Sequence, residues 1–80
     1  MALRFIGKDP ETNGDNCPTV WLDEGKQEFV VQGWKADEAL RAECLVAGPI
    51  PETEAVVRLP LRMAQQIREA LDAAERSPVR

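Results

Sequence analysis

The stretch TVWLDEGKQEFVVQGW, which runs from Thr19 to Trp34, decides the fold of this chain. Its two ends, residues 19–23 and 28–34, are rich in β-branched and aromatic side chains, which favour strands. The four residues between them, 24–27, are polar and include a glycine, as turns do. The stretch therefore predicts two antiparallel strands joined by a short loop.

The register of this hairpin follows from the same pattern. A loop of two or of four residues puts the same residues opposite one another. One face then holds four apolar side chains and is the expected core face, whereas the other carries both tryptophans of the chain. The expected pairs are Leu22 with Phe29 and Val20 with Val31 on the core face, and Trp21 with Val30 on the other, with Trp34 further along.

The segments on either side of the hairpin add further elements. Residues 3–7 alternate in polarity and predict another strand, and the polar residues 8–18 predict a loop. Residues 37–46 predict a short helix capped by Asp37, although their alternation also fits a strand. Residues 55–59 predict a fourth strand with Ala55, Val57 and Leu59 facing inward.

The clearest single element is a C-terminal amphipathic helix of about 16 residues. Pro60 suits its first turn, and charged or amide side chains fill its opposite face. Its apolar stripe recurs every three to four residues, and we expect that stripe to face the sheet: Met63, Ile67, Leu71 and Ala74.

Together these elements predict an α+β fold. An antiparallel sheet of three to four strands would pack one face on the C-terminal helix, with a short helix before the last strand. Residues 1–76 would form one small domain, and residues 77–80 would fray. A compact chain of 80 residues and 8.9 kDa should expose about 4,800 Å².

The composition excludes several classes of function. The chain has no histidine, which excludes Ser–His and Cys–His nucleophiles and histidine-ligated metals. Carboxylates are plentiful, but no pattern places a pair of them beside a pocket. We therefore expect no enzymatic activity and no cofactor. No apolar run is long enough for a membrane span, and the N-terminus lacks a signal-peptide core, so we expect a cytoplasmic protein.

Two further patterns bear on metals and redox chemistry. Cys17 and Cys44 are expected to be thiols, with Cys44 in the core; a bridge between them, or a reactive Cys17, are the alternatives. Residues 9–15 have the oxygen spacing that opens a calcium loop, but the twelfth position, where a glutamate belongs, is Val20. We expect no metal site.

Two groups of side chains are candidates for binding a partner. The tryptophan-bearing sheet face would offer an apolar patch of the kind that interfaces use. The alternative is that the proline-rich connector after residue 48 or the short helix covers both tryptophans. Basic side chains near the junction of the last strand and helix could contact an acidic partner or phosphate groups. The candidate residues are Trp21, Val30, Trp34, Arg58, Arg62 and Arg68.

Four segments carry a family resemblance across nearly the whole chain: residues 5–10 (FIGKDP), 18–21 (PTVW), 30–34 (VVQGW) and 50–60 (IPETEAVVRLP). In these segments the chain resembles small, uncharacterised actinobacterial (Streptomyces-type) proteins encoded beside XRE-type helix-turn-helix regulators. It is similar in style to the small acidic proteins associated with BldB and WhiJ. The resemblance implies a regulatory accessory protein that acts through protein contacts.

The function expected is therefore a non-catalytic interaction module that binds a helix-turn-helix transcription regulator. A second copy of the chain is another candidate partner. The net charge of −4 argues against nucleic-acid binding by the isolated domain. Two alternatives stay open: direct nucleic-acid binding through the arginine-bearing C-terminal helix, and an acidic DNA-mimicking or antitoxin-like protein.

Overall fold

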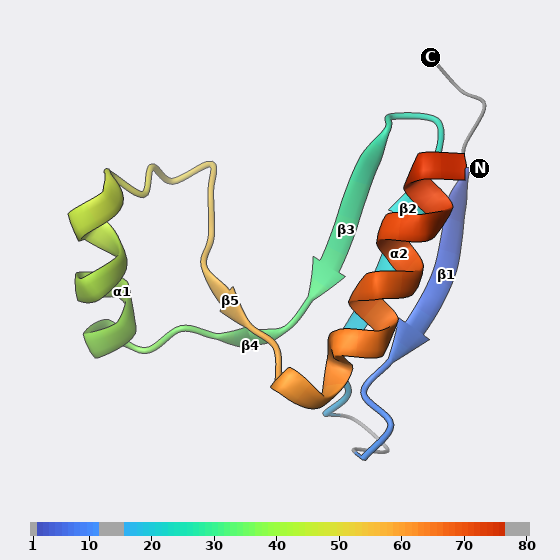
Figure 1. Ribbon diagram of the computed structural model, residues 1–80. Helices are drawn as coiled ribbons and strands as arrows, with labels where there is room; N and C mark the ends of the chain where they lie inside the picture. The colour runs from blue at the N-terminus through green and yellow to red at the C-terminus, as the bar shows by residue number, and fades with distance from the viewer. Residues whose placement is uncertain (1, 12–15, 77–80) are drawn as a thin grey trace.

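A computed structural model describes residues 2–11 and 16–76 (Figure 1). These residues form two small sheets, two helices and two short 3₁₀ turns. In chain order these are β1 (Leu3–Lys8), β2 (Thr19–Asp23), β3 (Glu28–Gln32), β4 (Trp34–Lys35), α1 (Glu38–Cys44), η1 (Leu45–Ala47), β5 (Val57–Arg58), η2 (Leu61–Met63) and α2 (Ala64–Arg76). The α+β class predicted from the sequence is confirmed.

The main sheet has three antiparallel strands in the order β1–β2–β3. The hairpin has the predicted register, with Val20 opposite Val31, Trp21 opposite Val30 and Leu22 opposite Phe29. On its other side, β2 pairs with β1 until a bulge after Phe5 shifts the register. The local pattern of residues 19–34 was therefore sufficient to fix the strand pairing.

Helix α2 covers one face of this sheet and lies over β1 and β2 (Figure 1). The core is small, and its centre consists of Val20, Met63 and Ala70, with Ile6 and Leu59 packed beside them. Met63, the last residue of η2 before α2, is fully buried in this cluster.

The predicted core face is only half right. Phe29 and Val31 of β3 are 50% and 42% exposed, and Ile67 and Leu71 of α2 are 40% and 47% exposed. Because α2 lies over β1 and β2, the β3 side of the sheet is left without cover. The residues of α2 that are buried are Ala70 and Ala73, small side chains that let the helix approach the sheet closely.

The predicted strand 28–34 breaks at Gly33. A Cβ atom at this position would lie 2.6 Å from the main-chain oxygen of Arg58, so only glycine allows the two segments to pass this closely. Beyond Gly33, β4 leaves the main sheet and pairs with β5 in a separate two-stranded ribbon. The predicted fourth strand therefore does not join the sheet, and it is reduced to Val57–Arg58. Ala55 and Val57 are exposed rather than inward, and Leu59 is half-buried.

Residues 36–56, which we call the arm, connect the two strands of this ribbon. The arm contains α1, so the helical prediction for this segment is confirmed over the strand. Asp37 caps α1, and its Oδ1 accepts a hydrogen bond of 2.9 Å from the Leu40 amide. Figure 1 shows the arm standing apart from α2 and the main sheet. Within the described ranges, no helix is long and apolar enough to cross a membrane.

Candidate functional site

The sheet face opposite α2, which we call the outer face, carries a row of apolar side chains across all three strands. Side chains alternate between the faces of a strand, and Val20 and Leu22 are buried on the helix side, so Trp21 projects from the outer face. Phe5 and Val30 lie directly opposite Trp21 on the two neighbouring strands. Phe5 is 57% exposed and Leu3 is 45% exposed, whereas Trp21 and Val30 are half-buried.

The structure brings together only two of the three residues predicted for this face. Trp21 and Val30 are neighbours, but Trp34 belongs to β4, beyond the break at Gly33. The indole Nε1 of Trp34 donates a hydrogen bond of 2.8 Å to Asn16 Oδ1. The guanidinium of Arg58, its partner across the ribbon, lies 5.5 Å from the ring centroid in a cation–π contact. Phe5 of β1, and not Trp34, joins Trp21 and Val30 on this face. The sequence signal for the position of Phe5 was the alternation of residues 3–7.

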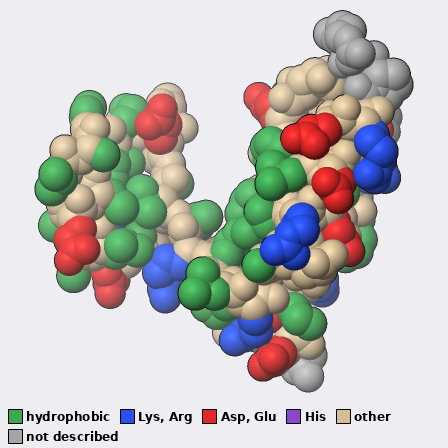
Figure 2. Space-filling model, viewed as in Figure 1, with side chains coloured by type: hydrophobic (Ala, Val, Ile, Leu, Met, Phe, Trp, Pro, Cys, Tyr) green, Lys and Arg blue, Asp and Glu red, His purple; other side chains and the backbone are tan. Residues whose placement is uncertain are grey.

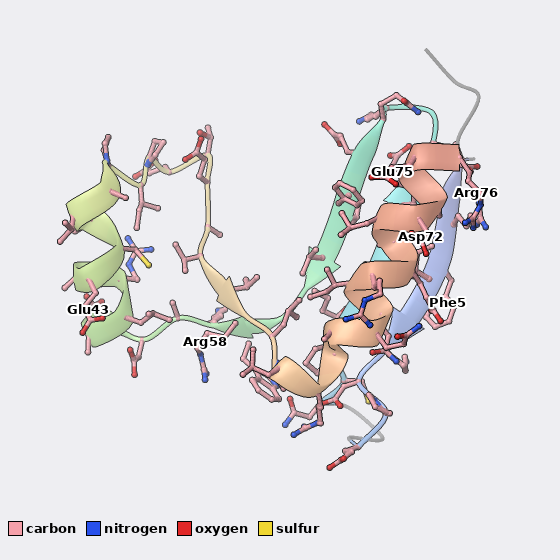
Figure 3. All side chains as sticks on the ribbon, viewed as in Figure 1. Phe5, Glu43, Arg58, Asp72, Glu75 and Arg76 are labelled. Carbon is pink, nitrogen blue, oxygen red and sulfur yellow. The ribbon has the colours of Figure 1, made fainter. Side chains whose placement is uncertain are left out.

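The three candidate arginines have three different surroundings. Arg58 stacks on Trp34 and donates to the main-chain oxygen of Lys35 through Nε and Nη2, each at 3.3 Å. Figure 3 shows Arg58 pointing away from the space between α1 and α2. Arg68 is exposed on α2 and donates to Gln65 Oε1 at 2.8 Å.

Arg62 forms an ion pair inside the fold. Its Nε and Nη2 donate to the two carboxylate oxygens of Asp9, whose side chain is completely buried. The hydrogen bond to Asp9, with the nearby charges of Asp9 and Glu11, raises the pKa of Arg62 above the ordinary value, while desolvation opposes that shift. Arg58, Arg62 and Arg68 therefore have partners in three different parts of the chain: β4, the loop after β1, and α2 itself.

The same ion pair engages the first residue of the calcium-like pattern. Asp9 directs its carboxylate at Arg62 and accepts a hydrogen bond of 3.0 Å from the Glu11 amide, as in an Asx turn. Residues 13–15 of the pattern lie outside the described residues. Within residues 2–11 and 16–76, no group of three or more acidic or cysteine side chains could hold a metal ion.

The two cysteines occupy different environments. Cys17, just before β2, is buried, and its carbonyl accepts hydrogen bonds from Thr19 Oγ1 and Gln32 Nε2. Cys44, at the end of α1, is only half-buried. The prediction that Cys44 lies in the core was therefore wrong, because α1 does not reach the core.

Sequence reasoning missed an apolar groove between β3 and α2, on the helix side of the sheet. It encloses about 250 Å³. Figure 2 shows hydrophobic side chains gathered along this flank of the body, facing the arm. The signal in the sequence was that β3 and α2 together have more apolar side chains than a single helix packed on the sheet can bury. The lining is entirely apolar and consists of Val20, Phe29, Val31, Leu59, Ile67, Ala70 and Leu71.

A second hollow adjoins this groove and separates the body from the arm. It encloses about 500 Å³ and shares Val31 with the groove. Lys35 lines it from the ribbon and Arg41 lines it from α1, and residues 55–57 complete the arm side. The hollow therefore adds basic side chains to an otherwise apolar surface.

Comparisons of the chain with protein-family models, with curated proteins and with solved structures found no match.

Proposed function

We propose that this chain is a non-catalytic protein-interaction module that binds a DNA-binding regulator of the helix-turn-helix class through its outer face. The observation that carries the proposal is the Phe5–Trp21–Val30 row on that face. Large aromatic side chains dominate the energetics of protein interfaces, because they bury much area with few rotatable bonds.

The exposure of the row supports a binding role over a purely structural one. Phe5 remains 57% exposed although it lies beside Trp21, and Leu3 on the same strand is 45% exposed. Burial of such side chains by a partner contributes about 1.5–3 kcal/mol for each one that becomes fully covered. On the outer face Trp21 could therefore anchor a partner, and Leu3 and Phe5 of β1 would add apolar contact area beside it.

The charge of the chain supports the class of partner. The chain carries 14 carboxylates against 10 basic groups, and proteins that bind DNA carry clustered lysine and arginine. Opposite charges accelerate encounter and favour the correct partner. The family resemblance given above points to the same class. Binding would bring an acidic protein close to the regulator and compete with DNA for its basic surface.

The proposal is tested with the purified regulator encoded nearest to this chain. Trp34→Phe is introduced first, so that Trp21 is the only tryptophan and its fluorescence reports on the outer face. Titration with the regulator should shift the emission of Trp21 to shorter wavelength as it becomes buried. Phe5→Ser, at a side chain that is already exposed, should weaken binding at least ~10-fold.

Leu61→Ser is the matched control. Leu61 is 93% exposed on η2, away from the outer face, so its replacement should leave the affinity unchanged. Circular dichroism verifies the fold of each variant. If the regulator does not bind, or if Phe5→Ser binds as tightly as Leu61→Ser, the outer face is not the binding surface.

A further inference from the structure

We propose that two copies of this chain form a dimer by exchanging arms, with residues 36–56 of each copy packed into the β3–α2 groove of the other. Three observations support the exchange: the surface area of the single chain, the apolar surfaces of the groove and the arm, and the distribution of charge. It concerns the opposite side of the sheet from the outer face and does not depend on the proposed function.

The single chain exposes more surface than a compact protein of its mass. Its accessible surface is 6083 Å², whereas a folded monomer of this size exposes about 4,800 Å². Its radius of gyration is 14.1 Å, against about 12 Å for a compact domain of this length. A standard interface buries about 800 Å² per partner, so the surplus of about 1,300 Å² is sufficient for a stable dimer.

Part of the excess exposed surface is apolar and lies in the groove. Phe29 and Val31 on the sheet side and Ile67 and Leu71 on the helix side are all between 40% and 50% exposed. They border one concave surface of about 250 Å³ with no polar lining residue. A convex apolar segment from a second chain would bury this surface, and exposed apolar patches are typical of such interaction sites.

The arm supplies such a segment. Every residue of α1 is at least partly exposed, and the helix has only seven residues. Helices this short are not stable alone in water and depend on packing. Leu45 and Val46, which follow α1, are 51% and 90% exposed. Figure 3 shows Glu43 on the side of α1 away from the body, and Figure 2 shows hydrophobic side chains on the side that faces it.

Charge selects contact between arm and body over contact between two arms. The arm carries five carboxylates and one arginine, which leaves nine carboxylates and nine basic groups on the rest of the chain. Two arms packed on each other would repel, whereas an arm against the neutral body would not. Lys35, at the end of β4 and outside the arm, lines the hollow next to the groove, where it would meet the acidic arm of the second copy.

Reciprocal exchange also closes the assembly. Each copy has one arm and one groove, so two copies related by a two-fold axis satisfy both and leave neither exposed. The expected product is a dimer of about 18 kDa that does not grow into longer chains. The mass follows from 8.9 kDa for one chain.

The first experiment is sedimentation equilibrium of the full chain at micromolar concentration. The wild type should sediment as a dimer. Ile67→Lys in the groove and Val46→Glu in the arm should each raise the dimer dissociation constant at least ~100-fold, because the dimer contains each change twice. Both side chains are substantially exposed in the single chain, so circular dichroism should show that the fold survives.

The second experiment mixes the two variants. The Ile67→Lys chain keeps an intact arm and the Val46→Glu chain keeps an intact groove, so one wild-type contact re-forms and the mixture should dimerise. The other contact sets a lysine against a glutamate. A dimer built from two grooves would be unaffected by Val46→Glu alone, and a dimer built from two arms would be unaffected by Ile67→Lys alone, so either result would contradict the exchange.

Several outcomes would overturn the exchange. They are a monomeric wild type, which includes an arm closed onto its own groove; a larger oligomer; and a mixture that stays monomeric. Phe5→Ser and Leu61→Lys are the controls and should remain dimeric, since neither side chain lies in the groove or the arm. Dimerisation that survives Phe5→Ser while regulator binding is lost separates this proposal from the proposed function.

Discussion

Asp9 and Arg62 form a two-pronged ion pair across 53 positions of the sequence. Arg62 Nε lies 2.7 Å from Asp9 Oδ1, and Nη2 lies 2.6 Å from Oδ2. The carboxylate is fully buried, and the guanidinium side chain is 38% exposed. The pair ties the loop after β1 to the 3₁₀ turn that leads into α2.

Arg62→Met should therefore lower the midpoint of urea unfolding clearly more than Arg68→Met does. The first change leaves a buried carboxylate without the guanidinium, and the second removes a contact at an exposed position. The double variant Asp9→Asn/Arg62→Met should recover part of the loss, because no buried charge remains. Equal midpoints for the two single variants would show that the pair does not stabilise the fold.

The pH dependence of this pair has a definite sign on the alkaline side. The hydrogen bond to Asp9 raises the pKa of Arg62, so the stabilisation is lost only when the pH rises past the ordinary arginine value toward the raised one. The difference in unfolding free energy between wild type and Arg62→Met should thus stay constant from neutral pH to about pH 10. Urea titrations at several pH values measure it.

Gly33→Ala should destabilise the chain by about 1–3 kcal/mol. The added methyl group would lie 2.6 Å from the Arg58 main-chain oxygen, which cannot move without disturbing the β4–β5 ribbon. Gly25→Ala is a suitable control, because its nearest neighbour would be the Ala2 side chain at 3.2 Å. Thermal unfolding should show a clearly smaller effect for the control.

Met63→Ala should cost about 2–5 kcal/mol, the range for truncating a large core side chain. Met63 is fully buried and lies at the centre of the core. Leu61→Ala, two residues earlier and 93% exposed, should change the unfolding free energy by less than about 0.5 kcal/mol. Similar losses for both would mean that α2 is anchored differently.

Gln66→Met should stabilise the chain by about 1 kcal/mol, since it removes a buried acceptor at nearly constant volume. Gln66 Oε1 is buried and finds no hydrogen-bond partner among the described residues. Gln65→Met at an exposed position of α2 is the control and should be nearly neutral. A loss of stability in Gln66→Met would indicate that the amide is satisfied by water.

The sequence predicted the hairpin residue by residue because strand pairing there depends on local pattern alone. Val20, Trp21 and Leu22 could pair with β3 in only one register that kept one face apolar. The same pattern could not show where α2 would lie across the sheet. That position follows from the small side chains Ala70 and Ala73, which settle over β1 and β2.

Long-range contacts account for the rest of what the sequence did not predict. The strand break at Gly33 comes from the approach of Arg58, 25 positions later, and no local signal marks it. The groove has a different cause: Phe29 and Val31 form the expected face, but α2 lies over β1 and β2 and leaves them without cover. In the candidate site, Trp21 and Val30 are neighbours as predicted, whereas Trp34 was separated from them by that break.

The β4–β5 ribbon makes the arm an insertion in topological terms. Trp34 lies opposite Arg58 and Lys35 opposite Val57, so residues 36–56 leave and re-enter the body at adjacent points. Replacing them with a two-residue turn such as Asn-Gly would close the ribbon as a hairpin and shorten the loop whose closure opposes folding. In this topology the arm is an insertion between two paired strands, and the sheet and α2 are connected on either side of it.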